Sequence, residues 1–586
     1  MSRARQPRTR KLKLKAQNPK PRTRKLTIIA QDPSVKVKNK ILLARIDVPA
    51  EEIGLGPWGY RTQVVDYDAS SATLYMPIKY PASKTENDGD PFEGASDGVL
   101  LNDPSFHAQN VYAIVMKTLA RFEFALGRRV SWGFYGHQLK IAPHAFAEAN
   151  AFYSEKDHAL MFGYFPGRSG RVIYSCLSHD VVAHETTHAL LDGLRERYTD
   201  PSSPEQAGFH EGFADIVALL SVFALPDIVA AVIDLSSPKR QEKMIASKDL
   251  TLEKLRRSTL LGLADEMGQE LSAVRGDALR RSAELPPSRK YIKDPEYMEP
   301  HKRGEILVAA MMNAFLTVWV NRLESLGEVR KGYLDRSRVV EEGASAADYL
   351  LTMAIRAIDY APPVNLEFCD FLSAILTSDR EINPNDSKYR FRQILRESFI
   401  SYGIDPASKG TKEEPGVWEP PEGRLTYERT HFESMQRDPD EVFRFIWENR
   451  RPLSLYDDAY SRVLSVRPCL RIGPDGFALR ETVAEYLQTI SLAASELKRL
   501  QIAVPDGMSK DQEVTLFGGG ALIFDEYGML KFHVRTRVND RERQTQRLKY
   551  LWEYGYFKKG ASAFRSFSFM HRQRALDAPN KAKEEW

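Results

Sequence analysis

The chain has 586 residues, with 83 Lys or Arg and 79 Asp or Glu, so its formal net charge is +4. Its 42% apolar and 10% aromatic residues allow large buried cores and exclude global disorder. At about 100–200 residues per domain, the length predicts three or four domains. The three cysteines are far apart and form no CxxC pair, which excludes a disulfide scaffold and argues against a zinc–thiolate site.

Residues 1–26 form a basic arm with eleven cations and no acidic residue, which leaves 72 basic against 79 acidic residues in the rest of the chain. The hexapeptide Pro-Arg-Thr-Arg-Lys-Leu occurs at 7–12 and again at 21–26. Such proline-containing, uniformly basic sequence predicts disorder. It also predicts a nonspecific anionic partner, either nucleic acid or a membrane surface. Without aromatic residues in the arm, sequence-specific nucleic acid recognition is not expected.

Residues 27–104 are rich in β-branched residues and turn formers, which predicts a β-rich N-terminal region. A helix is expected over 108–126, then strands and turns over 139–165, and mainly helices from 179 to 403. The apolar runs 216–235 and 306–320 are interrupted or too short to cross a membrane, so they predict buried core helices and no transmembrane segment. Because no apolar signal segment follows the basic arm, a cytoplasmic setting is expected.

Residues 405–424 carry four prolines and three glycines and predict a linker. Beyond it, residues 425–586 predict an α+β module of unknown role. Hairpins are expected at 463–477 and 514–538, with a helix between them at 481–500. The glycines at 518–520 predict a bulge or bend in a strand, because no Gly-Lys-Ser/Thr follows them as in a phosphate-binding loop.

The sequence His184-Glu185-Thr-Thr-His188 carries the clearest chemistry in the chain. On a helix, residues four apart share a face, so His184 and His188 can bind one metal ion. Glu185 beside them can take a proton from water. Zinc needs a third protein ligand if a fourth position is to stay open, and Glu211 at the start of the next apolar helix can supply it. Asp215, one turn after Glu211, can hold the other ring nitrogen of a ligand histidine.

These motifs resemble the thermolysin-like zinc metallopeptidases, or gluzincins. Residues 180–189 are similar to the family's active-site helix, and Asn150-Ala151-Phe-Tyr is similar to its substrate-pairing edge strand. His301 resembles the family's oxyanion-binding histidine, and the resemblance covers residues 105–404. It implies an α+β fold whose two-lobed core has a β-rich N-lobe and a helical C-lobe.

The resemblance also implies a mechanism. A Zn(2+) cofactor held by His184, His188 and Glu211 would activate water, with Glu185 as the general base. The resemblance also implies that His301 and Tyr198 donate hydrogen bonds to the oxyanion. It further implies that Asn150 and Ala151 bind the peptide as an added strand. Either Asp294 or Glu296 is expected to orient His301, and Arg275 is a candidate to bind substrate.

The leading functional hypothesis is therefore a zinc-dependent endopeptidase that acts on peptides or unfolded proteins. One alternative is an aminopeptidase of the related gluzincin branch, although no Gly-Ala-Met-Glu-Asn-like segment for a free amine precedes His184. Another is a catalytically vestigial binding or scaffold protein docked through its basic arm.

Overall fold

A computed structural model describes residues 23–558, apart from 38, 52, 81–88, 135, 168–169, 201, 237–242, 265–281 and 283. The architecture is mixed α+β, which confirms the predicted class. Most of the basic arm and Arg275 lie outside the described residues. The prediction of disorder is wrong for residues 23–26, which belong to strand β1 (Thr23–Ile29). This strand pairs with β4 (Leu43–Pro49), and Leu26 is fully buried, so the local charge pattern did not decide its structure.

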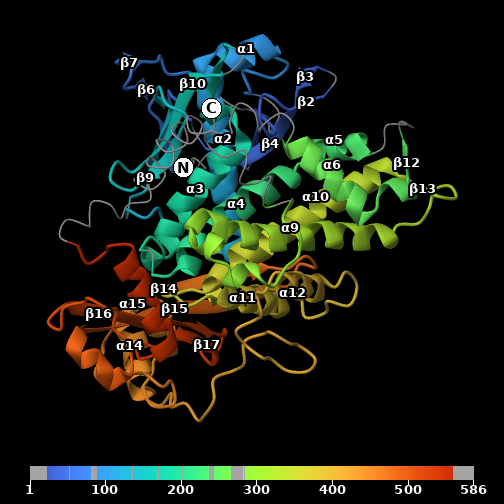
Figure 1. The fold of residues 1–586 in the computed structure, drawn as a ribbon. Helices are drawn as coiled ribbons and strands as arrows, with labels where there is room; N and C mark the ends of the chain where they lie inside the picture. The colour runs from blue at the N-terminus through green and yellow to red at the C-terminus, as the bar shows by residue number, and fades with distance from the viewer. Residues whose placement is uncertain are drawn as a thin grey trace, which may run out of the picture.

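Three layers follow one another along the chain (Figure 1). Strands form most of the first layer, a set of helices forms the second, and a C-terminal sheet covers the far side of those helices. Helix α2 (Pro104–Leu126) runs from the first layer to the C-terminal sheet, where the Leu470 amide donates to the Gly127 carbonyl. The predicted helix over 108–126 is confirmed and starts four residues earlier. Asp103 caps it by accepting from the Ser105 amide, and Gly127 ends it with a left-handed backbone.

The N-terminal sheet has the order β11-β10-β8-β5, with β9 paired to β10. Its strands confirm the β structure expected over 139–165, and their bounds are β5 (Thr62–Val64), β8 (Leu139–Phe146), β9 (Ala151–Ser154), β10 (Ala159–Pro166) and β11 (Val172–Tyr174). β8 and β10 run parallel, whereas the short β9 pairs antiparallel with β10. In the described part of the chain, β9 pairs with no strand other than β10, so it lies at an edge.

The helical layer confirms the mainly helical region expected over 179–403. Its long helices are α3 (His179–Leu194), α4 (Pro204–Phe223), α5 (Pro226–Ser236), α6 (Leu252–Ala264), α9 (Pro300–Glu324), α10 (Arg336–Ala357), α11 (Phe368–Ile382) and α12 (Phe391–Ser401). Helices α4 and α9 cross closely because both present glycine at the contact. A Cβ on Gly212 would lie 2.9 Å from the Gly304 carbonyl oxygen, so no larger residue fits without movement.

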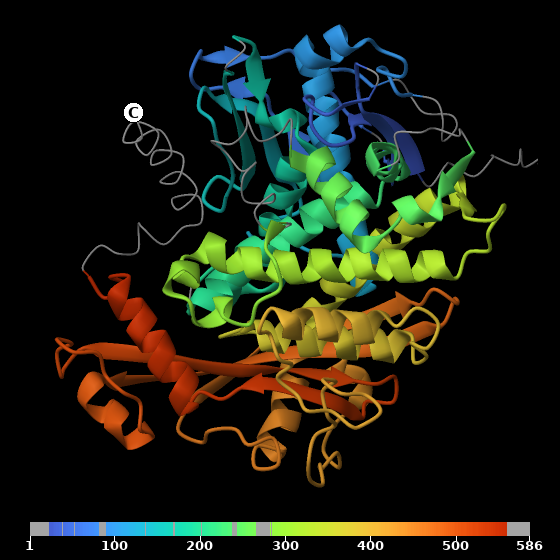
Figure 2. The same ribbon diagram turned by 45° about the vertical axis from the view of Figure 1, so that its right-hand side comes forward.

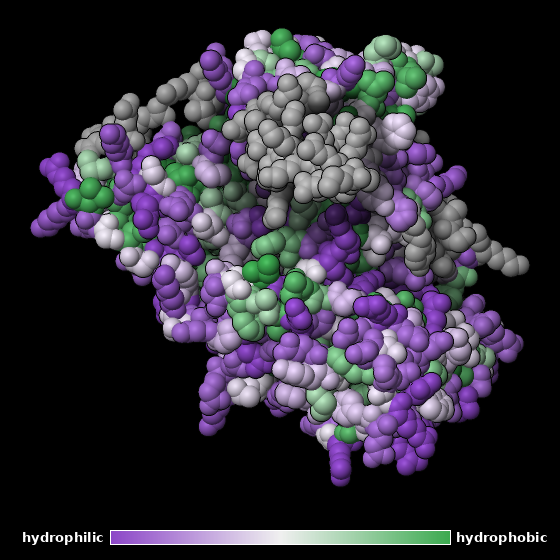
Figure 3. Space-filling model, turned by 180° about the vertical axis from the view of Figure 1, so that it is seen from behind, coloured by the Kyte–Doolittle hydropathy of each residue, from purple (hydrophilic) through white to green (hydrophobic). Residues whose placement is uncertain are grey.

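The apolar run in α9 is long and apolar enough to cross a membrane by composition, but 72% of that window is buried within the protein. The second apolar run divides into α4 and α5, which are bent by 81°. Both runs therefore supply core helices in this structure, as predicted. On the face seen in Figure 3, hydrophilic side chains predominate and hydrophobic ones lie in small separate groups.

The C-terminal sheet is antiparallel, in the order β14-β15-β16-β17, with α14 (Pro439–Glu448) and α15 (Arg541–Glu553) beside it (Figure 2). Its strands are β14 (Tyr460–Ile472), β15 (Ala478–Ala493), β16 (Glu513–Phe524) and β17 (Leu530–Thr536). Both expected hairpins are confirmed. Of the bulge or bend in a strand that was expected at Gly518–Gly520, the strand is confirmed, but no bulge occurs, because pairing with β15 runs unbroken through these glycines. The helix predicted over 481–500 is wrong: β15 occupies most of that range, followed by a short 3₁₀ segment at Ala494–Leu500.

A buried network of ion pairs fixes the C-terminal sheet to the helical layer. The Asp359 carboxylate accepts from Arg128 and Arg471, and Arg471 also pairs with Glu481 on β15. Asp359, Arg471 and Glu481 have fully buried side chains. Residues 405–424 contain no helix or strand, as a linker predicts, yet they pack on the core: Val417 is buried, and the Trp418 indole donates to the Tyr360 carbonyl.

Gly127 offers a direct test of how tightly the sheet is docked. It has a φ of +67°, and a Cβ there would lie 2.3 Å from the Leu470 carbonyl oxygen on β14. Gly127→Ala should therefore lower the free energy of unfolding by about 2–4 kcal/mol, the sum of backbone strain and overpacking. Gly94→Ala is the matched control, since Gly94 has a φ of +74° but open space around it and should lose only about 1–2 kcal/mol. Equal losses in urea unfolding of the two variants would contradict close docking.

Candidate metal centre

Two histidines on α3 and one glutamate on α4 meet in the interior. His184 and His188 lie one helical turn apart, and their Nε2 atoms are 2.7 Å from each other. The Glu211 carboxylate approaches both rings, with Oε2 3.7 Å from His184 Nε2 and Oε1 3.9 Å from His188 Nε2. All three side chains are buried. The structure thus brings together the three metal ligands that the sequence predicts, although they come from two separate helices.

The donor set fits a divalent transition metal. The ligand atoms of His184, His188 and Glu211 all lie within 4.8 Å of one another. Bonds of about 2.0–2.2 Å to one zinc ion would put such atoms about 3.3–3.5 Å apart, so only small side-chain movements are needed. Two imidazoles and one carboxylate leave a fourth position open, which is the composition of a catalytic zinc site rather than a closed structural one.

Asp215 supports this arrangement from the next turn of α4. Its Oδ1 lies 2.7 Å from His184 Nδ1, so the carboxylate holds a proton on Nδ1 and turns the Nε2 lone pair toward Glu211 and His188. His210 stands against the other ligand, with its ring stacked on the His188 ring at a centroid distance of 4.6 Å and an interplanar angle of 11°. Asp215 therefore occupies the supporting position that its spacing from Glu211 predicts.

Removing that support should weaken metal binding. Asp215→Ala leaves the His184 ring without its carboxylate partner, and we expect zinc affinity to fall about 10–100-fold. A competition titration against a chromogenic chelator measures this change. Asp227→Ala, which replaces an exposed aspartate on the neighbouring helix α5, is the control and should keep wild-type affinity. Equal affinities for all three chains would show that Asp215 does not position His184.

Glu185 is fully buried, and a main-chain donor fixes its carboxylate. The Tyr153 amide of edge strand β9 donates to Glu185 Oε2 at 3.0 Å. Sequence reasoning missed this contact, because a backbone amide leaves no trace in residue identity. The contact fixes the position of Glu185, the candidate catalytic base, relative to β9, the strand expected to bind peptide.

Asn150 and Ala151 lie at the start of β9. Ala151 pairs with Phe162 of β10, and the Asn150 carbonyl accepts from the Gly163 amide at 2.8 Å. The Asn150 side-chain nitrogen is buried and makes no hydrogen bond among the described residues. A buried amide donor of this kind is costly unless an acceptor reaches it.

His301 approaches the same group from the first turn of α9. Its Nε2 lies 3.6 Å from Glu211 Oε2, while Nδ1 contacts Glu299 Oε1 at 2.7 Å. The prediction that Asp294 or Glu296 orients His301 is wrong. Asp294 instead accepts from the Glu296 amide, and Glu296 pairs with Lys302.

Glu299 takes the orienting role because it is the N-cap of α9 and so lies directly beside the first turn. Its other oxygen accepts from the Lys302 amide at 2.9 Å. Burial by itself would raise the pKa of the Glu299 carboxyl, but hydrogen bonds from His301 and the helix amides lower it to about 2. The carboxylate therefore stays ionised and holds a proton on His301 Nδ1.

Tyr198 is not brought to the metal group. Its hydroxyl donates to the Pro362 carbonyl at 2.7 Å, and its ring packs edge-on against Phe209. The side chain is fully buried, and burial raises the pKa of the phenol. The expected oxyanion contact from Tyr198 is therefore absent from this structure, in which the residue ties the α3–α4 connection to the segment after α10.

Comparison with models of known protein families finds no match, and comparison with curated proteins finds none either. The geometry of the site and the chemistry of its side chains therefore indicate what the chain can do. Together these residues offer three potential metal ligands, an adjacent buried carboxylate and an edge strand whose Tyr153 amide donates to that carboxylate.

Proposed function

We propose that this chain is a zinc-dependent endopeptidase. The observation that carries the proposal is the position of Glu185, which is next to two metal-ligand candidates on α3 and is bonded to the amide of Tyr153 in β9. Zinc bound by His184, His188 and Glu211 would supply Lewis acidity to a scissile carbonyl and would lower the pKa of water.

The remaining chemistry belongs to the chain's own groups. Glu185 takes the proton from the attacking water and gives it to the leaving amine, so no net charge accumulates on the departing nitrogen. In its doubly protonated form, His301 donates from Nδ1 to the Glu299 carboxylate and from Nε2 to the oxygen that becomes negative. No step is assigned to Tyr198.

Substrate binding is assigned to the edge strand. A peptide that adds to β9 would offer carbonyl oxygens to the buried Asn150 amide, which needs an acceptor. A strand-like substrate is an extended, unfolded segment, so the substrate class we propose is peptides or unfolded parts of proteins.

End-blocked peptides test the mode of cleavage. We expect a quenched peptide library with acetylated amino ends and amidated carboxyl ends to be cut at internal bonds. Cleavage restricted to matched peptides with a free amino end would replace this proposal with an aminopeptidase. If a folded, zinc-loaded chain cut neither library, the chain would be a binding or scaffold protein.

A further inference from the structure

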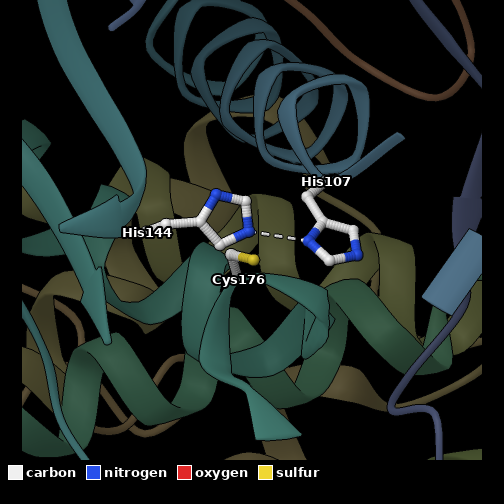
Figure 4. Close-up of side chains that lie close together, drawn as sticks. All are labelled: His107, His144 and Cys176. Carbon is white, nitrogen blue, oxygen red and sulfur yellow. Dashed lines mark hydrogen bonds between the residues drawn. The ribbon is translucent and has the colours of Figure 1, made fainter. Parts of the chain in front are cut away.

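A second group of metal-ligating side chains lies outside the candidate peptidase site. His107 comes from α2, His144 from β8 and Cys176 from the 3₁₀ turn Ser175–Leu177 that precedes α3. Their exposures are 1%, 1% and 0%. One nitrogen of each ring and the sulfur lie within 4.8 Å of one another, and Figure 4 shows the three side chains converging.

The outer nitrogen of each ring has its own acceptor. His107 Nε2 lies 3.1 Å from the Leu101 carbonyl oxygen, which can only accept, so this nitrogen carries a proton. His144 Nδ1 lies 2.9 Å from both oxygens of the Asp66 carboxylate and donates to it. These are the supporting contacts that usually orient ligand histidines, a backbone carbonyl for one ring and a carboxylate for the other.

The inner nitrogens consequently face each other with their lone pairs. His107 Nδ1 and His144 Nε2 are 2.8 Å apart, and two neutral imidazoles held this way repel unless a cation lies at that point. The cation is either a proton or a metal ion.

The candidate peptidase site contains the same arrangement. There, too, two histidine nitrogens lie 2.7 Å apart, and a carboxylate, Asp215, holds the outer nitrogen of one ring. At the second group the third donor is a thiol instead of a carboxylate. A proton shared between the rings gives the sulfur no role, whereas a metal ion uses all three donors.

We propose that His107, His144 and Cys176 form a second, buried three-ligand site for zinc or a zinc-like divalent ion, separate from the peptidase centre. Three tyrosine rings surround His144 and shield the three donors from water: Tyr75, Tyr164 and Tyr174, at centroid distances of 5.0, 6.4 and 5.2 Å. Two imidazoles and one thiolate suit zinc. Burial raises the pKa of the Cys176 thiol, so binding would displace one proton from sulfur to solvent.

The site has a definite structural consequence. It would join α2 and β8 to the turn that leads directly into α3, the helix that carries His184 and His188. The absence of a CxxC pair argued against zinc–thiolate binding, but that argument applies only to neighbouring ligands, and these three come from separate elements. The inference does not depend on the proposed peptidase activity.

Cobalt provides a probe that distinguishes the two sites, because thiolate ligation gives cobalt(II) a near-ultraviolet charge-transfer band and the peptidase centre has no sulfur ligand. The chain to use carries His188→Ala, which disables the first site, with Cys369→Ser and Cys469→Ser, which leave Cys176 as the sole cysteine. Purified from cobalt-supplemented medium, it should hold one tightly bound cobalt per chain and show the band.

Adding Cys176→Ser to that chain should remove both the band and the bound ion, and His144→Asn should lower the cobalt content with the thiol still present. Circular dichroism checks that each variant is folded. A folded parent chain without the band would overturn the proposal, and so would a band that survives Cys176→Ser. The absence of the band can be detected with the parent chain alone, so the test remains valid even if the Cys176→Ser chain misfolds.

Discussion

Glu185→Gln should lower kcat/KM for peptide hydrolysis by about 10²–10⁴-fold while zinc content stays unchanged. The substitution keeps the size of a fully buried side chain, and the carbonyl of the introduced side-chain amide can still accept from the Tyr153 amide. A side-chain amide, however, cannot take a proton from water at neutral pH. The loss should therefore appear in catalysis and not in metal binding. Initial rates on a quenched peptide, measured at equal zinc content, provide the comparison.

Glu253→Gln is the matched control, since Glu253 is exposed on α6 and should retain full activity. If the Glu185→Gln chain were as active as this control at equal zinc content, another group would have to accept the proton. A loss of zinc together with activity would instead assign Glu185 a role in building the metal group.

Asp359→Asn should lower the free energy of unfolding by about 3–5 kcal/mol, the usual cost of breaking a buried ion pair by removing one partner. Asp359 accepts from both Arg128 and Arg471, and these three residues lie where β14 meets the helical layer. Removing its charge leaves two buried guanidinium groups with less compensation. Urea denaturation followed by fluorescence and by circular dichroism measures the change.

The pH dependence of stability gives a second readout of the same network. Burial alone would raise the pKa of Asp359, but Arg128 and Arg471 bring it below the usual carboxyl range. The stabilisation that Asp359 contributes is therefore complete at pH values above the pKa of an aspartate in the unfolded chain, about 3.9. It is lost as the pH falls below that value. Asp359→Asn should flatten this acid limb.

Glu553→Gln serves as the control for the ion-pair prediction. Glu553 forms an exposed pair with Lys549, and breaking that pair should cost less than about 1 kcal/mol. Similar losses for Asp359→Asn and Glu553→Gln would contradict the view that the buried network fixes the C-terminal sheet.

The local parts of the fold could be predicted because their signals lie within a few residues. Helical periodicity identified α2, and the four-residue spacing of His184 and His188 identified a shared helix face. Turn residues at 474–476 and 526–528 located both hairpins. Each of these features is decided mainly by the residues that form it.

The failures have a common cause in tertiary contacts. β15 is paired on both sides by β14 and β16, and residues 481–488 are all buried, so the strand lacks the alternation that distinguishes it from a helix. The contact of Glu299 with His301 was missed because it depends on helix capping. The contact of the Tyr153 amide with Glu185 was missed because its donor belongs to the main chain. His107, His144 and Cys176 are too far apart in sequence to form a motif.

The most direct test of the proposed peptidase is zinc reconstitution of activity. A chain stripped of metal should not cut an end-blocked quenched peptide, and added zinc should restore internal cleavage in the wild type. The His188→Ala chain, folded and treated identically, should stay inactive at every zinc concentration. Cleavage by the stripped wild type, or equal cleavage by His188→Ala, would contradict a zinc peptidase centred on His184, His188 and Glu211.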